Sequence, residues 1–482
     1  MCKVDSGKVW LRDDIPEKPL VGEGVRILLC SENVPPQVNG IARRVGHYAE
    51  GLRRLGCDVN LLHPDSGYEK VLPHVNPWNF TAKMMCLLPG HLFQLVNESY
   101  DVVHVVLPLN LSGMWLLAAY KIRRCIVGET SPCLVLSWHC NLVDYINFHS
   151  PPFLRDFCFA CIIGGLCSML PSISDRILTP TKATEPDVVS MWEGRSGVCY
   201  TGIEKGSFTP SNKDSEWGKR WEEEKKNYLK EHQCDFLLVC VGRLSPEKGC
   251  FDLIKALPIM ERCALWFVGD GPSRLELELL SKEMNIPVKF LGYQKGESLH
   301  ATYSIADCFV CPSLTETFGQ TVNEALASQV RVSLPSVPVF VEAYSDIIPD
   351  DAFWEPTNRQ SMAKAILKQL DRHRMKDIKG IPDLKKLKSW EDTCELLLNE
   401  YQEAMKNRQK VFKLSKIILF PFWYAITFLA AVWILYMSTI RTMCGGSFRA
   451  LVSTAPKRVE NSLKDVKRKY LLERQESPKK IE

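Results

Sequence analysis

Short apolar runs alternate with longer amphipathic stretches from residue 25 to about residue 390, a pattern typical of strand, loop and helix units. Because strands that alternate with helices form parallel sheets, the pattern predicts an α/β fold. The runs fall into two series, separated by a charged stretch. The runs that we interpret as strands are residues 25–30, 57–62, 101–107, 133–138, 176–181, 198–203, 236–241, 264–268, 288–292 and 307–311.

The charged stretch at residues 210–234 has its charges at helical spacing, which predicts a solvated connector with a helix that carries no chemistry. Residues 390–405 form an amphipathic pattern, which we expect to be a helix that packs back on the first domain. The predicted organisation is an extension at 1–24, a first domain at 25–209, the connector at 210–234, a second domain at 235–388, the closing helix at 389–411, a membrane span at 417–440 and a basic tail at 441–482.

The membrane span is predicted from residues 417–440, twenty-four residues without one charge. A helix needs about 20 apolar residues to cross the hydrocarbon core, so this stretch can span a bilayer once. Trp423, Tyr424 and Tyr436 are of the type that anchors at membrane interfaces. Lys and Arg flank the stretch on both sides, so the side of the tail stays open.

Charge and cysteine usage narrow the partners and the compartment. The chain carries a net charge of +4. The tail at residues 441–482 carries +6, which leaves −2 for the rest of the chain, so we expect no nucleic-acid binding. The nineteen cysteines are scattered, several inside apolar runs, which indicates free thiols in a reducing compartment. Two Cys-x-x-Cys pairs occur, Cys158/Cys161 and Cys308/Cys311, but both lie in apolar segments without a second matched pair or clustered histidines, so no metal site is predicted.

The stretch at residues 312–329, PSLTETFGQTVNEALASQ, concentrates the candidate chemistry. It follows an apolar run and places Glu316 in a loop and Glu324 in a helix, eight positions apart. A carboxylate can hold a pair of sugar hydroxyls, and a helix N-terminus suits a phosphate. The alternative is that Glu316 only caps the helix and Glu324 is a solvated helix residue.

Two further sites follow predicted strands. The segment GRLSPEKG at residues 242–249 places Arg243 and Lys248 in a loop, where two cations suit a pyrophosphate without a metal ion; as isolated basic residues they would mean little. His139 follows residues 133–138, and residues just past parallel strands line the crevice of such sheets. Gly40 is the first residue of a predicted helix after the first strand. The glycine either lets the loop approach a ligand or is required only by the backbone conformation at the start of the helix.

The segments at residues 241–248 and 312–329 resemble the donor site of retaining glycosyltransferases that have two Rossmann-like domains facing a cleft, the GT-B fold, and the chain is similar to family 4 of these enzymes. The resemblance extends from about residue 26 to residue 405. Within this group the chain is most similar to sulfoquinovosyltransferases of plants and bacteria, and more distantly similar to lipid mannosyltransferases.

The resemblance implies a role for each candidate residue. Arg243 and Lys248 would hold the donor diphosphate, helped by backbone N–H groups at Phe318, Gly319 and Gln320, and the loop of Gly40 would approach the phosphates and the acceptor. Leu291 would contact the base and Glu324 would bind the ribose. Glu316 would bind the transferred sugar, and His139 would face the reacting centre. The nucleotide sugar would be a co-substrate, with no cofactor and no metal.

The implied activity is transfer of a sugar from a UDP-linked donor, such as UDP-sulfoquinovose, to a lipid such as diacylglycerol. The alternatives are a mannosyl- or glucosyltransferase on another lipid or lipid-linked glycan, and an inactive homologue that acts as a membrane scaffold. Gln329 and Arg331 stand where the family usually has Gly and Pro, and the glycine-rich segment expected between residues 348 and 354 is missing. The expected location is the cytosolic face of an endomembrane, or a plastid membrane; protein partners are not predicted.

Deletion of residues 412–482 tests the anchor. The cut falls beyond the closing helix, so we expect a soluble, folded protein that still binds donor nucleotide but acts poorly on lipid in bilayers. Each cation near an anionic leaflet adds about 1 kcal/mol of attraction, so the deleted tail reinforces the span. Fractionation after high-salt and carbonate washing checks this. A truncated protein that stays in the membrane pellet would show that another segment is the principal anchor.

Overall fold

The computed structural model describes residues 22, 24–37, 39–66, 70–73, 83–87, 89–107, 111–127, 132–139, 173–184, 195–204, 206–377 and 384–406. The predicted membrane span at 417–440 and the basic tail at 441–482 lie outside these residues. Within the described part of the chain, no helix combines the length and apolar character needed to cross a membrane.

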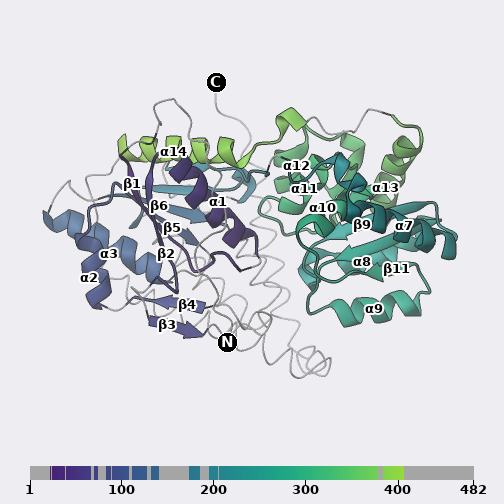
Figure 1. Ribbon diagram of the computed structural model, residues 1–482, viewed down its shortest axis with the longest axis horizontal. Coiled ribbons are helices and arrows are strands. Elements are labelled where there is room, and N and C mark those ends of the chain that lie inside the picture. The colour runs from purple at the N-terminus through teal and green to yellow at the C-terminus, as the bar shows by residue number, and fades with distance from the viewer. Residues whose placement is uncertain are drawn as a thin grey trace, which may run out of the picture.

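The first domain is built on a parallel sheet with the strand order β2-β1-β5-β6-β7-β8 (Figure 1). Its strands are β1 (Arg26–Cys30), β2 (Asp58–Leu62), β5 (Val102–Leu107), β6 (Cys133–Trp138), β7 (Arg176–Thr179) and β8 (Ser196–Val198). A separate antiparallel pair is formed by β3 (Lys70–Pro73) and β4 (Lys83–Cys86).

The second domain repeats this architecture with the order β11-β10-β9-β12-β13-β14, again all parallel. Its strands are β9 (Phe236–Val241), β10 (Cys263–Val268), β11 (Val288–Phe290), β12 (Cys308–Val310), β13 (Val332–Pro335) and β14 (Phe353–Trp354). The two parallel sheets confirm the predicted α/β fold with two Rossmann-like domains.

Helices cover the two sheets. Those of the first domain are α1 (Gly40–Arg54), α2 (Pro89–Asn97) and α3 (Leu111–Val127). Those of the second domain are α7 (Glu216–Glu231), α8 (Cys250–Ala256), α9 (Arg274–Glu283), α10 (Gly296–Ser304), α11 (Gln320–Ala327), α12 (Pro338–Tyr344) and α13 (Arg359–Arg374). The last described helix is α14 (Trp390–Lys406), which runs along the first domain in Figure 1.

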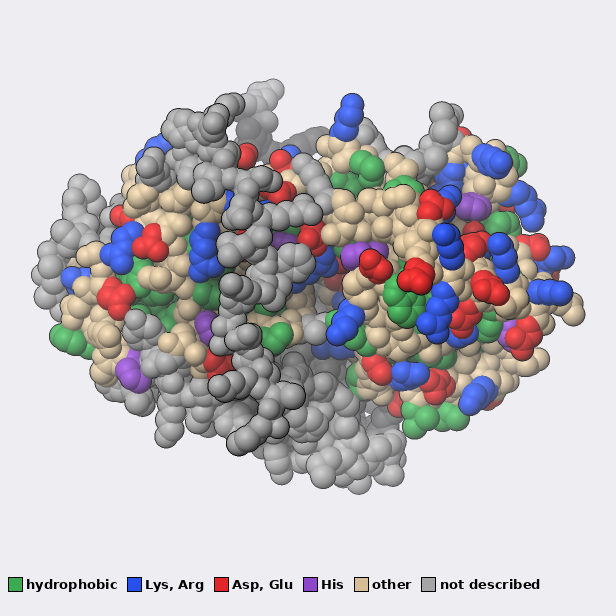
Figure 2. Space-filling view, viewed as in Figure 1, with side chains coloured by type: hydrophobic (Ala, Val, Ile, Leu, Met, Phe, Trp, Pro, Cys, Tyr) green, Lys and Arg blue, Asp and Glu red, His purple; other side chains and the backbone are tan. Residues whose placement is uncertain are grey.

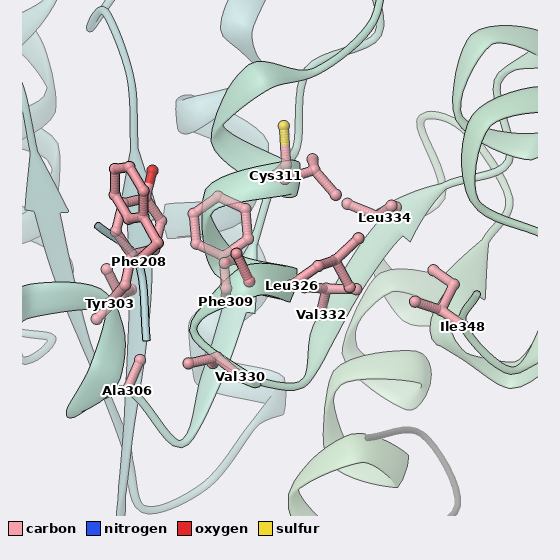
Figure 3. Close-up of a cluster of buried hydrophobic side chains, with 14 of the residues drawn as sticks. Phe208, Tyr303, Ala306, Phe309, Cys311, Leu326, Val330, Val332, Leu334 and Ile348 are labelled. Atoms are coloured by element: carbon pink, nitrogen blue, oxygen red, sulfur yellow. The ribbon is translucent and has the colours of Figure 1, made fainter. Parts of the chain in front are cut away.

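The core of the second domain forms on both faces of its sheet because β9, β10 and β12 are apolar throughout. Figure 3 shows Phe309 of β12 and Leu326 of α11 among the buried side chains on one face. Helix α7 lies in the predicted connector, yet its Trp221 is part of this core and donates a hydrogen bond to Ser298 Oγ of α10 (3.2 Å). That buried face joins α7 to the second domain.

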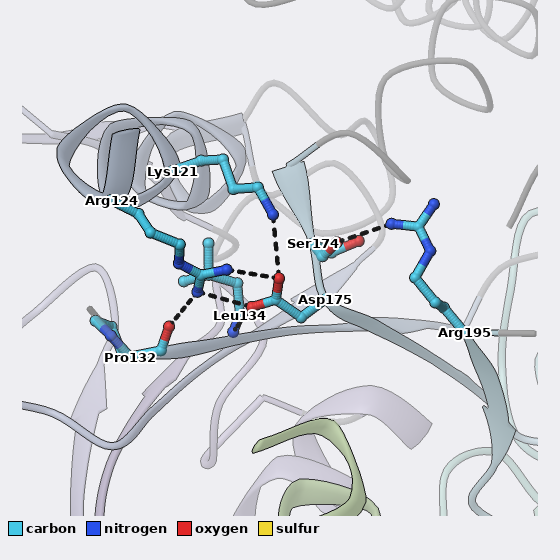
Figure 4. Close-up of polar contacts among 7 residues, drawn as sticks. All are labelled: Lys121, Arg124, Pro132, Leu134, Ser174, Asp175 and Arg195. Carbon is cyan, nitrogen blue, oxygen red and sulfur yellow. Dashed lines mark hydrogen bonds and ion pairs between the residues drawn. The ribbon is translucent and has the colours of Figure 1, made fainter. Parts of the chain in front are cut away.

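A buried carboxylate fixes α3 against the first sheet (Figure 4). Asp175 accepts hydrogen bonds from Lys121 Nζ (3.1 Å), from the Arg124 guanidinium (2.7 and 2.8 Å) and from the Leu134 N–H (2.9 Å). Burial alone would raise the pKa of Asp175, but the two cations outweigh it and lower the pKa. The carboxylate therefore stays charged and ties the helix to β6 and β7.

Helix α14 returns the chain to the first domain, as the amphipathic pattern predicts. Leu397 and Tyr401 are fully buried in the core that α14 shares with α1, and a Cβ atom at Gly51 of α1 would lie 2.3 Å from Cys394 Sγ. The Tyr401 hydroxyl also hydrogen-bonds His104 Nδ1 (2.6 Å) beneath the helix. Close backbone approach and a buried polar contact together position α14.

The predicted strand at residues 198–203 is wrong in position. The strand is β8 (Ser196–Val198), and Ile203 makes only an isolated bridge with Ser389. The chain leaves the sheet there because it crosses toward the second domain: a Cβ atom at Gly202 would lie 2.6 Å from the Ser389 backbone. Glycine permits that close approach.

Leu397→Ala should lower the free energy of unfolding by about 2–5 kcal/mol, because it leaves a cavity where α14 meets the first domain. Urea unfolding measures the change. Glu395→Ala, on the exposed face of the same helix, is the matched control and should stay within about 0.5 kcal/mol of the parent protein. Equal effects of the two substitutions would show that α14 is not part of the cooperative core.

Candidate active site

The candidate site of the second domain lies where the strand order reverses. After β9 the chain adds β10 and β11 on one side, and β12 then pairs with the other side of β9. Ligands of open parallel sheets bind beyond the carboxyl ends of the strands at such a switch point. The loops after β9 and β12 carry Lys248 and Glu316, so the topology itself brings the two predicted segments together.

Lys248 and Glu316 form an ion pair, with 2.5 Å between Lys248 Nζ and Glu316 Oε1. Both side chains are mostly buried, with exposed fractions of 24% and 18%. Burial alone would lower the pKa of Lys248, but the charge and the hydrogen bond of Glu316 raise it. The Lys248 ammonium is therefore charged at neutral pH.

Arg243 lies beside this pair and is more than half exposed, with its guanidinium 3.4 Å from Glu247 Oε1. Gly249, which follows Lys248, has a φ of +70°, and a Cβ atom there would lie 2.3 Å from the Pro312 carbonyl oxygen. A glycine is needed at this position for the loop of Lys248 to pack on the loop of Glu316.

The turn that begins α11 is fixed by its surroundings. Gly319 has a φ of +97°, and a Cβ atom there would lie 2.6 Å from the Phe340 ring. The Tyr344 hydroxyl donates toward the carbonyl oxygens of Phe318 (3.3 Å) and Gly319 (3.0 Å). Gln320 is the first helical residue, so this turn presents the N-terminus of α11 near the loop of Glu316.

Glu324 is not the solvated helix residue of the alternative interpretation, because its side chain is only 5% exposed. The Tyr303 hydroxyl donates a hydrogen bond to Oε2 (2.7 Å), and Arg43 of α1 forms an ion pair with Oε1. Burial and the charge of Glu324 raise the pKa of Tyr303 well above its usual range, so this hydroxyl remains a donor. No sequence pattern predicts the contacts of Arg43 and Tyr303 with Glu324.

His139 directly follows β6 in the first domain and is buried. No described residue makes a hydrogen bond to its Nε2. Burial, with the charge of Arg44 and the neighbouring His104, lowers the pKa of His139 well below its usual range. The neutral imidazole therefore carries an unused polar atom at the strand end.

The remaining predicted residues lie at loop ends. Gly40 is the first residue of α1, where a Cβ atom would meet nothing within 4 Å, and Asn39 caps the helix through the Ala42 N–H (2.8 Å). Leu291 follows β11; its N–H donates to the Phe267 carbonyl (2.9 Å) and its carbonyl accepts from the Gln294 amide (2.8 Å).

Some buried polar atoms at strand ends and in α11 have no hydrogen-bond partner among the described residues. They include His139 Nε2, Thr179 Oγ1, Ser313 Oγ, Asn323 Oδ1 and both polar atoms of the Gln320 amide. Thr179 ends β7, Ser313 lies just beyond β12, and Gln320 and Asn323 belong to α11. Buried polar atoms are paired in most proteins, so each of these atoms is a candidate contact for a ligand with hydrogen-bonding groups.

Another residue that the sequence did not identify is Glu32, just after β1. It is buried and accepts a hydrogen bond from the Met85 N–H (3.0 Å). Burial raises its pKa to about 8, although the hydrogen bond opposes the shift. Glu32 is therefore a mostly neutral acid at pH 7 beside the predicted acceptor loop.

The two domains touch directly around the site. The carboxylate of Glu342 in α12 accepts hydrogen bonds from the N–H groups of Lys182 and Ala183 (both 2.8 Å), in a short helix of the first domain. The Asn323 amide donates to the Thr201 carbonyl (3.2 Å). With the Arg43–Glu324 ion pair, these contacts join α11 and α12 of the second domain to the first domain.

The two departures from the family pattern are accommodated locally. Gln329 has a φ of +56°, a left-handed conformation that glycine adopts more easily. The Arg331 side chain reaches the carbonyl oxygens of Arg372 and Asp377. Both lie at the far end of α11 from Gly319, so they leave the N-terminal turn of the helix intact.

No group of three potential metal-ligating side chains occurs among the residues that the structure describes. Figure 2 shows Lys and Arg interspersed with Asp and Glu over the visible face of the second domain. Neither sign of charge dominates that face.

Comparison with known proteins identifies the chemistry. Residues 220–378 match the family of glycosyl transferases group 1, and this segment contains Lys248, Glu316 and Glu324. The protein is a glycosyltransferase. A GDP-mannose-dependent alpha-mannosyltransferase of Mycobacterium tuberculosis is 28% identical over 326 residues, which cover 65% of this chain and 79% of that protein.

Two further relatives are, by name, a sulfoquinovosyl transferase and a synthase of a glucosyldiacylglycerol. The sulfoquinovosyl transferase SQD2 of Arabidopsis thaliana is 25% identical, over 68% of this chain and 62% of that protein. The alpha-monoglucosyldiacylglycerol synthase of Acholeplasma laidlawii is 26% identical, over 69% of this chain and 83% of that protein.

Solved structures support the two-domain GT-B fold. The catalytic domain of starch synthase IV from Arabidopsis thaliana superposes with a TM-score of 0.56 at 14% identity, over 80% of this chain and all of that chain. A sucrose-phosphate synthase from Thermosynechococcus elongatus gives a TM-score of 0.52 at 19% identity, over 84% of this chain and all of that chain.

Proposed function

We propose that this glycosyltransferase retains the anomeric configuration and transfers a sugar from a nucleoside diphosphate to a membrane lipid. The observation that carries the proposal is the meeting of Lys248 and Glu316 at the switch point between β9 and β12. Lys248 is a cation that can bind a phosphate, and Glu316 is an acceptor that can bind sugar hydroxyls. Their proximity suits a ligand in which a phosphate is joined to a sugar.

In this proposal Lys248, Arg243 and the N-terminus of α11 offset the diphosphate charge. Protein groups then supply the positive charge, so the enzyme needs neither a metal ion nor another cofactor. Glu316 binds the transferred sugar, Glu324 the ribose and Leu291 the edge of the base. The neutral His139 offers Nε2 to the sugar near its reacting carbon.

The reaction is a substitution at the sugar C1. The acceptor hydroxyl oxygen forms a bond to C1 while the bond from C1 to the diphosphate oxygen breaks. The hydroxyl proton passes to the leaving diphosphate, which Lys248 stabilises as negative charge develops.

The relatives support a lipid acceptor, with diacylglycerol as our first choice and a UDP-linked sugar such as UDP-sulfoquinovose as donor. The predicted span at 417–440 and the basic tail would bring the site to a membrane, on the cytosolic face of an endomembrane or on a plastid membrane. The second candidate is a GDP-mannose donor, favoured by the mycobacterial relative.

A panel of donors tests the proposal. The full chain in mixed micelles should transfer sugar to diacylglycerol from one of UDP-glucose, UDP-sulfoquinovose or GDP-mannose, and the product should be the α-anomer by NMR. EDTA should leave the rate unchanged. A β-linked product would overturn retention, and a rate that EDTA abolishes and magnesium restores would overturn the metal-independent mechanism.

Lys248→Ala should weaken binding of UDP or GDP by about 1.5–3 kcal/mol, the usual range for one charge-assisted hydrogen bond. Titration calorimetry measures the loss, and thermal unfolding should show a much smaller effect on stability. Lys255→Ala removes an exposed lysine from the neighbouring helix and is the matched control. Unchanged nucleotide affinity in Lys248→Ala would exclude this loop as the diphosphate site.

A further inference from the structure

The ion pair between Arg43 and Glu324 crosses the domain boundary at the proposed donor site. Arg43 lies in the first turn of α1, and Glu324 lies in α11 of the second domain. The Glu324 side chain is 5% exposed and the Arg43 side chain 31% exposed. A carboxylate buried to this extent needs a charged or hydrogen-bonding partner.

Both oxygens of the Glu324 carboxylate already have partners. Tyr303 donates to Oε2 from a fully buried position, and Arg43 occupies Oε1. Tyr303 belongs to the core of the second domain, whereas Arg43 reaches across from the other domain, with its guanidinium carbon 5.7 Å from the Phe208 ring centre. Arg43 is therefore the partner that a ligand can displace.

We propose that Arg43 is a displaceable plug on the ribose subsite: it neutralises Glu324 when no donor is bound and moves away when the donor's ribose binds. The inference rests on the proposed role of Glu324. Each carboxylate oxygen can accept two hydrogen bonds, but the Glu324 side chain is only 5% exposed and the Arg43 guanidinium lies on Oε1, so a ribose diol reaches this oxygen only when Arg43 moves. Donor binding then includes the free energy of breaking this interdomain contact, which lowers the apparent affinity.

Other contacts between the domains, among the described residues, involve neither Arg43 nor Glu324. Glu342 binds the N–H groups of Lys182 and Ala183, and Asn323 binds the Thr201 carbonyl. These contacts involve no donor-site carboxylate, so they can persist while Arg43 moves. The nucleotide thus competes with one arginine, and the domains need not separate completely.

The test compares Arg43→Gln with Arg54→Gln, which removes an exposed arginine from the last turn of the same helix. Binding of UDP and GDP is measured by calorimetry, and binding of uridine and guanosine by ligand-observed NMR. For the base that the enzyme accepts, Arg43→Gln should bind the nucleoside and the nucleoside diphosphate more tightly, each by the same factor of about three to ten. Arg54→Gln should match the parent protein.

The nucleoside separates this role from phosphate binding. A loss of nucleoside diphosphate affinity with unchanged nucleoside affinity would make Arg43 a diphosphate ligand and overturn the proposal. Unchanged or weaker binding of both ligands would also overturn it. Arg43→Lys keeps a shorter cation beside Glu324 and should give a smaller gain than Arg43→Gln; an equal gain would exclude the ion pair as the cause.

Failure of the proposed function gives a different result. A parent protein that binds neither UDP nor GDP would exclude the donor site itself. If Lys248→Ala weakens nucleotide binding but Arg43→Gln does not strengthen it, the proposed donor site stands and the role of Arg43 as a plug is excluded.

Discussion

The reversal of strand order beside β9 is the constraint on which the site depends. Because β10 and β12 pair with opposite edges of β9, the loops after β9 and β12 must meet without an intervening strand. Gly249 lets the backbones of these loops approach, and the Lys248–Glu316 ion pair then forms between them. The chemistry of the site follows from a topology that β-branched and aromatic residues in the strands already favour.

The first domain contributes Arg43 to the candidate site, and α14 ties the chain back to that domain. Helix α14 packs on α1, and the first turn of α1 carries Arg43, which forms the ion pair with Glu324. Packing in the first domain therefore determines where a charged group meets the second domain. A substitution that shifts α1 by a small distance would act on the donor site through this helix.

Local patterns predicted most of the fold and singled out Lys248 and Glu316, which the structure brings together. The apolar runs predicted β6 and β9 at the positions the structure gives, and the pattern of residues 312–329 predicted the helix of Glu324, which is α11. Arg43 could not be found in this way, because 281 positions separate it from Glu324 and no spacing rule relates residues of different domains. The apolar run at residues 198–203 wrongly predicted a strand, because Cys199 and Ile203 are buried where the chain passes from the first domain to the second, and not in the sheet.

The candidate site contains two acidic groups, Glu316 and Glu324, and the cations that neutralise them come from different domains. Lys248 comes from the same domain as Glu316, so their pair can persist while the domains move. Arg43 comes from the other domain, so its pair with Glu324 depends on how the domains sit. A nucleoside diphosphate offers a new partner to both: its phosphates attract Lys248, and its ribose hydroxyls can satisfy Glu324 in place of Arg43. In the proposed donor site only the second exchange breaks a contact between domains, so ribose binding, rather than phosphate binding, would couple the donor to domain movement.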